Sequence, residues 1–174
     1  MSELVERLKS KDEDAFKELM TAYKVPLFRY IRTMVRNNEL AEELTQDTFV
    51  KVYFKIGSMR TDNLKSWIYT IATNLVRSEF RKKRIREFFS LSDINEAEIS
   101  YTESDDEKTL VWRLIAHLPE KYKTPVIMKE INGFTFEEIS DVLKKPVGTI
   151  KTLVFRGKAK MKEKYEVLKF GVVK

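Results

Sequence analysis

The sequence predicts an all-α protein in which two small helical domains are joined by a flexible acidic linker, the second domain containing a helix-turn-helix. Three observations lead to this prediction. The 174 residues include only five glycines and four prolines, so long helices can run without interruption. Apolar residues recur at helical spacing, and no strand-like alternation competes with it. The third observation is the uneven distribution of charge.

Charge divides the chain into three parts. Residues 1–89 carry 18 basic and 13 acidic side chains, whereas residues 90–107 carry seven acidic and no basic ones. Residues 108–174 carry 15 basic and seven acidic side chains. The middle part is also polar and weakly periodic, so we expect extended or disordered backbone there. The net charge of +6 permits a polyanionic partner without establishing one.

In the first domain, cap and turn signals separate the predicted helices. Asp12, within a break at 10–14, is the expected N-cap of the second helix. Pro26 is placed in the first turn of a further helix over 25–35, where the missing N–H of proline is tolerated. The remaining helices of this domain are predicted over 39–56 and 64–86, with a loop at 58–63.

In the second domain, a helix is predicted over 109–117, and Pro119 opens the next one. Residues 134–161 then suggest a short helix, a tight break and a second helix rich in cations. This is the helix-turn-helix arrangement, whose second helix enters the major groove of DNA. Pro146 and Gly148 break the chain, and Thr149 is the expected N-cap of the second helix.

The second helix of this motif has two different faces. Ile150, Val154, Gly157 and Met161 mark an inward face, with Gly157 allowing a neighbouring helix to come close. The opposite side carries hydroxyls and cations that can reach phosphates or guanine edges. These residues are Thr149, Lys151, Thr152, Arg156, Lys158 and Lys160. An ordinary helical hairpin with a solvated basic face is the alternative.

The segment 40–53 is unusual for a chain that binds nucleic acid. A polar, acidic stripe occurs at helical spacing, and no cation appears before Lys51. The stripe consists of Glu39, Glu42, Glu43, Gln46 and Asp47. Such a stripe repels phosphate, so it is either a solvated face or a docking face for a protein that carries basic residues.

The segment 66–86 interleaves aromatic residues with cations. Trp67 begins it, Asn74 and Arg77 offer hydrogen bonds, and a dense basic block follows. The block consists of Arg81, Lys82, Lys83 and Arg84. Aromatic rings with cations suit single-stranded DNA, because its bases can stack on the rings and its phosphates can pair with the cations. The alternative is that Trp67 is a core residue and the block a solvated helix end.

Composition argues against several other classes of protein. There is no cysteine, so neither a disulfide nor a thiolate metal site is possible. The longest uncharged run, 66–76, is 11 residues long and too short to span a membrane. The N-terminus alternates charges and lacks a signal-peptide core, so a cytoplasmic protein without membrane insertion is expected. His117 is the single histidine and no glycine-rich phosphate loop is present, so we expect no enzyme, cofactor or metal.

Three segments, in this order and spacing, resemble a bacterial RNA polymerase sigma factor of the extracytoplasmic-function (ECF) group. The family's core-polymerase-binding helix is matched by AEELTQDTFVKVY. Its promoter-melting region is matched by SWIYTIATNLVRSEFRKKR, and its upstream-element reader by LPEKYKTPVIMKEINGFTFEEISDVLKKPVGTIKTLVFRGKAKMK. The resemblance covers nearly the whole chain. It implies an alternative sigma factor that binds core RNA polymerase and directs promoter recognition, DNA melting and transcription initiation.

The resemblance implies two domains, region 2 over 1–89 and region 4 over 108–174, and a role for each residue already singled out. Polymerase binding is implied for Glu43, Gln46, Asp47, Phe49 and Lys51. Contact with the downstream promoter element is implied for Trp67, Asn74, Arg77, Arg81, Lys82, Lys83 and Arg84. Contact with the upstream element is implied for Thr149, Lys151, Thr152, Arg156, Lys158 and Lys160.

Two further implications of the family concern regulation and specificity. An anti-sigma factor is an expected partner, and the acidic linker is expected to thread toward the polymerase active-site cleft. The family usually has arginine at the position of Leu153 and alanine at the position of Gly157. Leucine makes no bidentate base contact, so the base contact that an arginine would offer at this position is missing.

Two other functions remain open at this point. A stand-alone helix-turn-helix regulator would use only residues 108–174, which leaves the acidic stripe and the aromatic-basic helix without a role. A helical adaptor that binds other proteins leaves the basic face around Arg156 without a role. The three functions differ in whether DNA binding depends on core polymerase. A regulator binds DNA alone, a sigma factor needs core polymerase and an adaptor binds no DNA. A monomer is expected outside such complexes.

Overall fold

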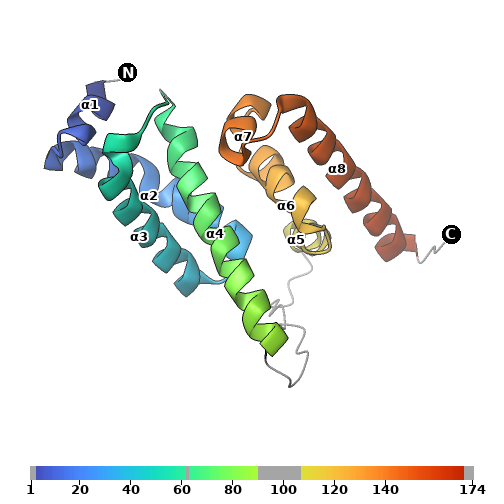
Figure 1. Cartoon of the computed structure of the whole chain (residues 1–174). Coiled ribbons are helices and arrows are strands. Elements are labelled where there is room, and N and C mark those ends of the chain that lie inside the picture. The colour runs from blue at the N-terminus through green and yellow to red at the C-terminus, as the bar shows by residue number, and fades with distance from the viewer. Residues whose placement is uncertain (1–2, 62, 90–106, 171–174) are drawn as a thin grey trace. The chain divides into compact units, whose positions relative to one another are not determined.

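The computed structural model describes residues 3–61, 63–89 and 107–170. These ranges contain helices and no strand, so the all-α prediction is confirmed (Figure 1). The chain forms two compact units that divide near residue 86. The linker predicted over 90–107 lies outside the described residues, except for Glu107, which begins a helix.

In residues 3–61 and 63–89, the first unit is built from four α-helices and one short turn. They are α1 (Glu3–Lys9), α2 (Glu13–Val35), α3 (Asn38–Lys55), the 3₁₀ turn η1 (Ile56–Ser58) and α4 (Leu64–Phe89). Helices α2 and α3 pack along each other, and α1 packs on α2 and on η1. The helices predicted over 39–56 and 64–86 therefore exist, the second extending three residues further than expected.

The core of the first unit surrounds a buried tyrosine of α2. The hydroxyl of Thr73 donates to the carbonyl oxygen of Tyr69 over 2.6 Å, so the Tyr30 hydroxyl donates to Thr73 Oγ1 over 2.7 Å. The rings of Tyr30 and Tyr69 meet edge to face, with centroids 5.1 Å apart. The fully buried apolar side chains of this core include Leu8, Leu19, Leu27, Ile31, Val52, Ile56, Ile68 and Val76.

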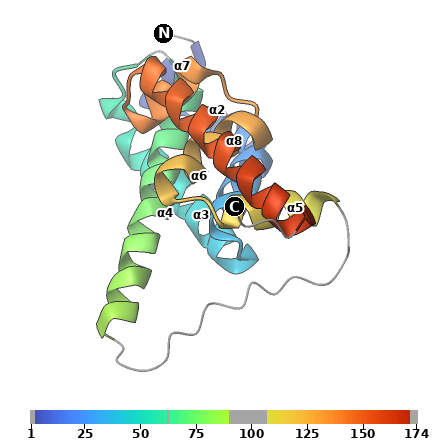
Figure 2. The same cartoon turned by 90° about the vertical axis from the view of Figure 1, so that its right-hand side faces the viewer.

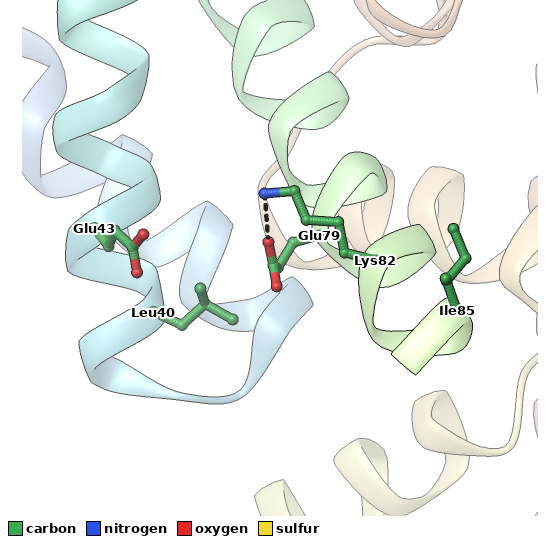
Figure 3. Close-up of a pocket in the computed structure, with 5 residues that line it drawn as sticks. All are labelled: Leu40, Glu43, Glu79, Lys82 and Ile85. Atoms are coloured by element: carbon green, nitrogen blue, oxygen red, sulfur yellow. Dashed lines mark hydrogen bonds and ion pairs between the residues drawn. The ribbon is translucent and has the colours of Figure 1, made fainter. Parts of the chain in front are cut away.

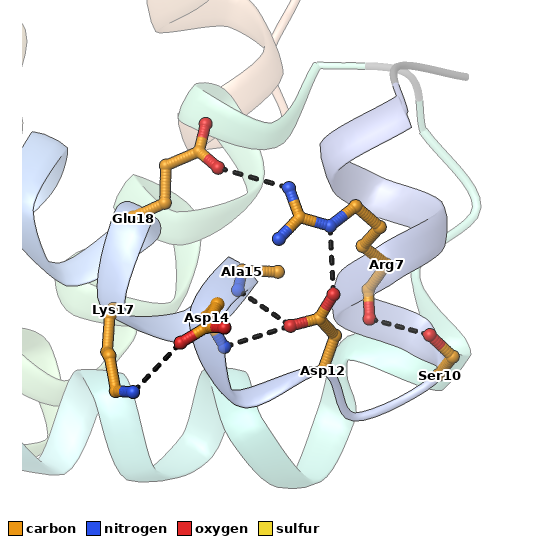
Figure 4. Close-up of polar contacts among 7 residues, drawn as sticks. All are labelled: Arg7, Ser10, Asp12, Asp14, Ala15, Lys17 and Glu18. Atoms are coloured by element: carbon orange, nitrogen blue, oxygen red, sulfur yellow. Dashed lines mark hydrogen bonds and ion pairs between the residues drawn. The ribbon is translucent and has the colours of Figure 1, made fainter.

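Helix α2 begins at the N-cap that the sequence predicted, Asp12. Its Oδ1 accepts the backbone N–H groups of Asp14 and Ala15 at 2.9 and 3.0 Å (Figure 4). Its other oxygen, Oδ2, accepts the Arg7 Nε–H over 2.9 Å, and Arg7 also reaches Glu18 (Figure 4). The Arg7 hydrogen bond and the backbone N–H of Ala15 hold the pKa of the Asp12 carboxyl below its ordinary value. One carboxylate thus both starts α2 and fastens α1 to it.

The separate helix predicted over 25–35 is wrong, because α2 runs through Pro26 without a break. Apolar residues on both sides of the proline stay in phase, since Leu19, Leu27 and Ile31 are all buried on one face of α2. Pro26 itself is exposed, so the carbonyl group that loses its N–H partner there faces water. Burial of the continuous apolar face outweighs the local cost of the proline.

The second unit contains the predicted helix-turn-helix. Its elements are α5 (Glu107–Ala116), α6 (Glu120–Val126), the π-helical turn η2 (Ile127–Ile131), α7 (Phe136–Leu143) and α8 (Val147–Phe170). Helix α8 packs mainly against α6, and Figure 2 shows these two helices side by side. Leu118, Tyr122 and Val126 form a core cluster against which Leu153 and Met161 of α8 pack.

The π-helical turn η2 is an element that the sequence did not predict. The backbone N–H of Asn132 bonds to the carbonyl oxygen of Ile127 five residues earlier, over 3.1 Å. Gly133 then adopts a left-handed conformation with φ of +67°, which glycine accepts without strain. The N–H of Phe134 returns to the carbonyl oxygen of Met128 over 3.0 Å. This turn sets the direction from which α7 starts.

The predicted close approach at Gly157 is confirmed. A Cβ atom at this position would lie 2.6 Å from Val126 Cγ2 and 3.3 Å from Tyr122 Cβ, so α6 and α8 touch where only a hydrogen fits. The predicted cap at Thr149 is wrong, because α8 already begins at Val147. Pro146 precedes that first residue, and its carbonyl oxygen accepts the N–H of Ile150 over 3.0 Å. Thr149 instead stands exposed in the first turn.

We predict that Asp12→Ala destabilises the first unit in a pH-dependent way. The folded state holds the Asp12 carboxylate at a pKa below its ordinary value of 3.8, so the unfolded chain binds this proton more tightly. The stabilisation is therefore complete above that ordinary pKa and is lost as the pH falls through the folded one. Thermal unfolding from pH 7 to pH 3, followed by Trp67 fluorescence in a Trp112→Phe background, measures this dependence. The exposed neighbour Glu13→Ala is the control, and a pH-independent difference between Asp12→Ala and wild type would contradict the prediction.

We predict that Gly157→Ala destabilises the second unit by about 1 kcal/mol, because the cost of overpacking exceeds the gain in helix propensity. Val126→Ala removes the methyl group that the new Cβ meets, so the double variant should recover part of this loss. Denaturant unfolding followed by Trp112 fluorescence, in a Trp67→Phe background, measures both. A stabilised Gly157→Ala protein would show that α6 and α8 are not held in close contact.

Candidate functional site

The acidic stripe lies on the outer face of α3. Its five members, Glu39, Glu42, Glu43, Gln46 and Asp47, are all exposed, as is Lys51. The inner face of the same helix is buried and includes Ala41, Leu44 and Val52. Phe49, also predicted to contact polymerase, is only 9% exposed, so it holds α3 in the core rather than presenting a contact surface.

The outer face of α3 continues into an apolar end that the sequence analysis missed. Val50 is 53% exposed, Tyr53 42% and Phe54 76%. The Phe54 ring stands nearly perpendicular to the Tyr53 ring, with centroids 5.5 Å apart, and Tyr53 also meets Phe16 of α2. Positions 43, 47, 50 and 54 repeat at helical spacing, so the acidic and apolar parts form one continuous face. We name this whole surface the α3 outer face.

Two hollows flank the acidic part of the α3 outer face. One, of about 340 Å³, is lined by Lys24, Val25 and Phe28 of α2 and by Glu42, Thr45 and Gln46 of α3. The other, of about 570 Å³, lies between α3 and α4 (Figure 3). It is lined by Leu40, Glu43, Glu79, Lys82 and Ile85, and the Lys82 ammonium pairs with Glu79 over 3.2 Å. A partner lying along α3 therefore finds apolar recesses and carboxylates together.

The aromatic-basic segment is part of α4, where four of its predicted residues share one face. Trp67, Asn74, Arg77 and Arg81 follow at intervals of seven, three and four residues. Trp67 is partly buried, so it belongs neither wholly to the core nor wholly to the surface. The other three are exposed. The side chain of Arg84 lies outside the described part of the chain.

The remaining predicted residues of the basic block lie off that face. Lys82 is turned toward Glu79 at the hollow beside α3, and Lys83 is exposed. Lys82 therefore partly neutralises a carboxylate, which reduces the charge it can offer to a phosphate. The α4 face that suits single-stranded DNA is the one that carries Trp67, Asn74, Arg77 and Arg81.

The predicted outward face of α8 is present. All six of its predicted residues are exposed, while Ile150, Val154 and Gly157 are buried on the opposite side. Two of the six already form an ion pair or a hydrogen bond within the described part of the chain. The Lys158 ammonium pairs with Glu130 over 3.1 Å, and the Thr152 hydroxyl donates to the Gly148 carbonyl oxygen over 2.9 Å.

Two residues of α8, Leu153 and Phe155, lie in positions that the sequence analysis did not predict. Leu153 packs against the cluster of Leu118, Tyr122 and Val126. Its side chain therefore contributes to the core, and the direct base contact considered for this position is not available from it. Phe155, which the sequence analysis missed, is 74% exposed beside Arg156. An apolar ring on this face can contact the methyl group of thymine in the major groove.

The structure is a two-unit helical protein in which one unit carries a helix-turn-helix with an exposed basic face and the other pairs an acidic-apolar face with an aromatic-basic helix, the arrangement expected of a DNA-binding protein that also docks on a protein partner. Within the described ranges, every helix is too short or too polar to span a bilayer. His117 lies exposed just beyond α5.

Comparison with known proteins agrees with this description. Residues 19–85 match the family described as Sigma-70 region 2, and residues 108–161 match Sigma-70, region 4. The chain is 28% identical to the ECF RNA polymerase sigma factor SigW of Bacillus subtilis, over 91% of this chain and 93% of that protein. It is 30% identical to the RNA polymerase sigma-H factor of Pseudomonas aeruginosa, over 90% of this chain and 89% of that protein. The chain belongs to the ECF group of RNA polymerase sigma factors.

Solved structures show the same fold. The chain of CnrH, in complex with the cytosolic domain of CnrY, matches with a TM-score of 0.73 at 19% identity, covering 94% of this chain and 96% of CnrH. The sigma factor RpoE of Bartonella quintana, in complex with the anti-sigma factor NepR, matches with a TM-score of 0.71 at 24% identity. That match covers 87% of this chain and 97% of RpoE.

Proposed function

We propose that this sigma factor docks on core RNA polymerase through the α3 outer face. The observation that carries the proposal is that one continuous exposed face is acidic in its first half and apolar in its second. The carboxylates suit a partner helix with basic residues and set its orientation. Burial of Val50, Tyr53 and Phe54 against the partner removes apolar surface from water and so contributes to affinity. The family's polymerase-binding role for this helix supports the proposal.

The two units contact promoter DNA through different chemistry in this proposal. The first unit, proposed as the domain 1–89, holds single-stranded downstream DNA on the α4 face, with Asn74 bonding a base and Arg77 and Arg81 bonding phosphates. The second unit, proposed as the domain 108–174, places α8 in the major groove of the upstream element. Arg156 and Phe155 are both exposed there, so the guanidinium can bond a guanine edge and the ring can contact a thymine methyl group.

We also propose that an anti-sigma factor holds the protein inactive in the cytoplasm. This proposal is supported by solved structures that share the fold, in which RpoE is bound to the anti-sigma factor NepR and CnrH is bound to the cytosolic domain of CnrY. A partner that covered the apolar end of α3 would remove exposed apolar surface from water and block polymerase at the same time. Neither catalysis nor a cofactor is part of this mechanism.

In vitro transcription tests the function as a whole. Purified core polymerase is incubated with fragmented genomic DNA, with and without this protein, and the RNA 5′ ends are sequenced. New start sites preceded by a shared pair of motifs are the expected result. Stable binding to core enzyme without new starts would indicate an inhibitor, and sequence-specific DNA binding without core enzyme would indicate a stand-alone regulator.

We predict that Asp47→Lys weakens binding to core polymerase at least tenfold, because a like charge then faces the basic partner. Phe54→Ser should weaken it by a similar amount through loss of apolar contact, although neither variant alters the buried side of α3. Binding is measured with labelled protein, and folding by circular dichroism. Glu163→Lys, an exposed charge reversal on α8, is the matched control. Wild-type affinity in both variants would place the docking face elsewhere.

We predict that Asn74→Ala lowers the yield of open complex about tenfold while docking to polymerase stays unchanged, since one base contact is typically worth about 1–3 kcal/mol. The side chain is exposed, so no loss of stability is expected. Permanganate footprinting of unpaired thymines measures opening, and gel-shift titration measures docking. Equal reactivity in wild type and variant would show that Asn74 makes no such contact.

A further inference from the structure

One aromatic ring at the start of α7 has two lysines beside it. The Lys129 ammonium lies 4.7 Å from the centroid of the Phe136 ring, and the Lys151 ammonium lies 5.7 Å from it. Lys129 belongs to the π-helical turn η2 and Lys151 to α8, so the ring draws cations from two different elements together. At such distances the electron-rich face of a ring attracts an ammonium group.

The two lysines are held to different degrees. Lys129 is partly buried, and its ammonium also donates to the carbonyl oxygen of Phe134 over 3.2 Å. Phe134 is itself fixed, being 1% exposed and bonded through its N–H to Met128. Lys151 is exposed on the DNA-facing side of α8, and the Phe136 ring is its one contact among the interactions of the described residues.

The carboxylates near this ring have other partners or face water. Glu138 and Thr135 form a reciprocal cap, in which the Thr135 N–H bonds to Glu138 Oε2 over 2.8 Å and the Glu138 N–H to Thr135 Oγ1 over 3.1 Å. Glu130 pairs with Lys158, and Glu137 is exposed. Within the part of the chain that the structure describes, neither Lys129 nor Lys151 forms an ion pair. Both charges are therefore left for an external anion.

We infer that Lys129 and Lys151 bind backbone phosphates of duplex DNA, and that Phe136 is the positioning residue that holds both ammonium groups for this contact. The inference deepens the proposed DNA-binding role of the second unit and rests on it. A phosphate attracts an ammonium group more strongly than a ring does, so the ring orients the lysines without competing for them. Contacts of this kind fix the register of α8 on the groove without selecting a sequence.

The test measures binding of the full-length protein, assembled with core polymerase, to a promoter duplex at several salt concentrations. Lys129→Ala and Lys151→Ala should each lower the slope of log affinity against log salt by about 1, since each removes one phosphate contact. Phe136→Leu should weaken binding several-fold and lower the slope as well, whereas Phe136→Tyr keeps the ring and should behave as wild type. The loss of affinity in each of the weakened variants should be equal for promoter and unrelated duplexes.

Two controls make the outcome decisive. Trp112 fluorescence and thermal unfolding establish that Phe136→Leu is folded. The double variant Phe136→Leu/Lys151→Ala should lose no more DNA affinity than the sum of the losses in the two single variants. An unchanged salt slope in Lys129→Ala or in folded Phe136→Leu would overturn the inference. Arg156→Ala separates this failure from a failure of the proposed function. If Arg156→Ala loses promoter preference while the other variants match wild type, only the inference fails; if no promoter preference exists at all, the proposed function fails.

Discussion

The contact between Gly157 and α6 fixes how α8 is rotated about its own axis, and the surface that we propose faces DNA depends on that rotation. With no side chain at position 157, the backbone of α8 lies directly against Val126 and Tyr122. Val154 is buried on the same side as Gly157, so Phe155 and Arg156, which lie between these two residues, are turned outward. The exposure of Arg156 and Phe155 is thus a consequence of packing on the far side of the helix.

In the first unit, too, burial of one side of a helix determines which residues face outward, and the two helices concerned present charges of opposite sign. Burial of one side of α3 presents carboxylates and then apolar rings, while burial of one side of α4 presents an amide and cations. A surface that repels phosphate and a surface that attracts it therefore lie on adjacent helices of one small unit. This separation allows a protein partner and a nucleic acid to be bound at the same time without competing for one site.

Periodicity in the sequence predicted these faces well, because burial on a helix repeats every 3.6 residues and the buried positions are apolar. It predicted the Asp12 cap and the close approach at Gly157 for equally local reasons. The break at Pro26 was wrong because the apolar face of α2 continues across it, and the cap at Thr149 was wrong because the helix starts two residues earlier. Exposed Phe54 and Phe155 were missed because an aromatic residue at helical spacing resembles a core residue until the core is seen.

The π-helical turn η2 makes the helix-turn-helix sensitive to the length of the chain before it. A bond that spans five residues instead of four accommodates one residue more than a regular helical turn needs. Deleting a single residue here would let α6 continue as a regular helix and would turn everything after it by roughly a quarter of a revolution. Related sequences that differ by one residue in this short stretch would then present the same reading helix in a different orientation, so a change of length outside the reading helix could change which groove edge is read.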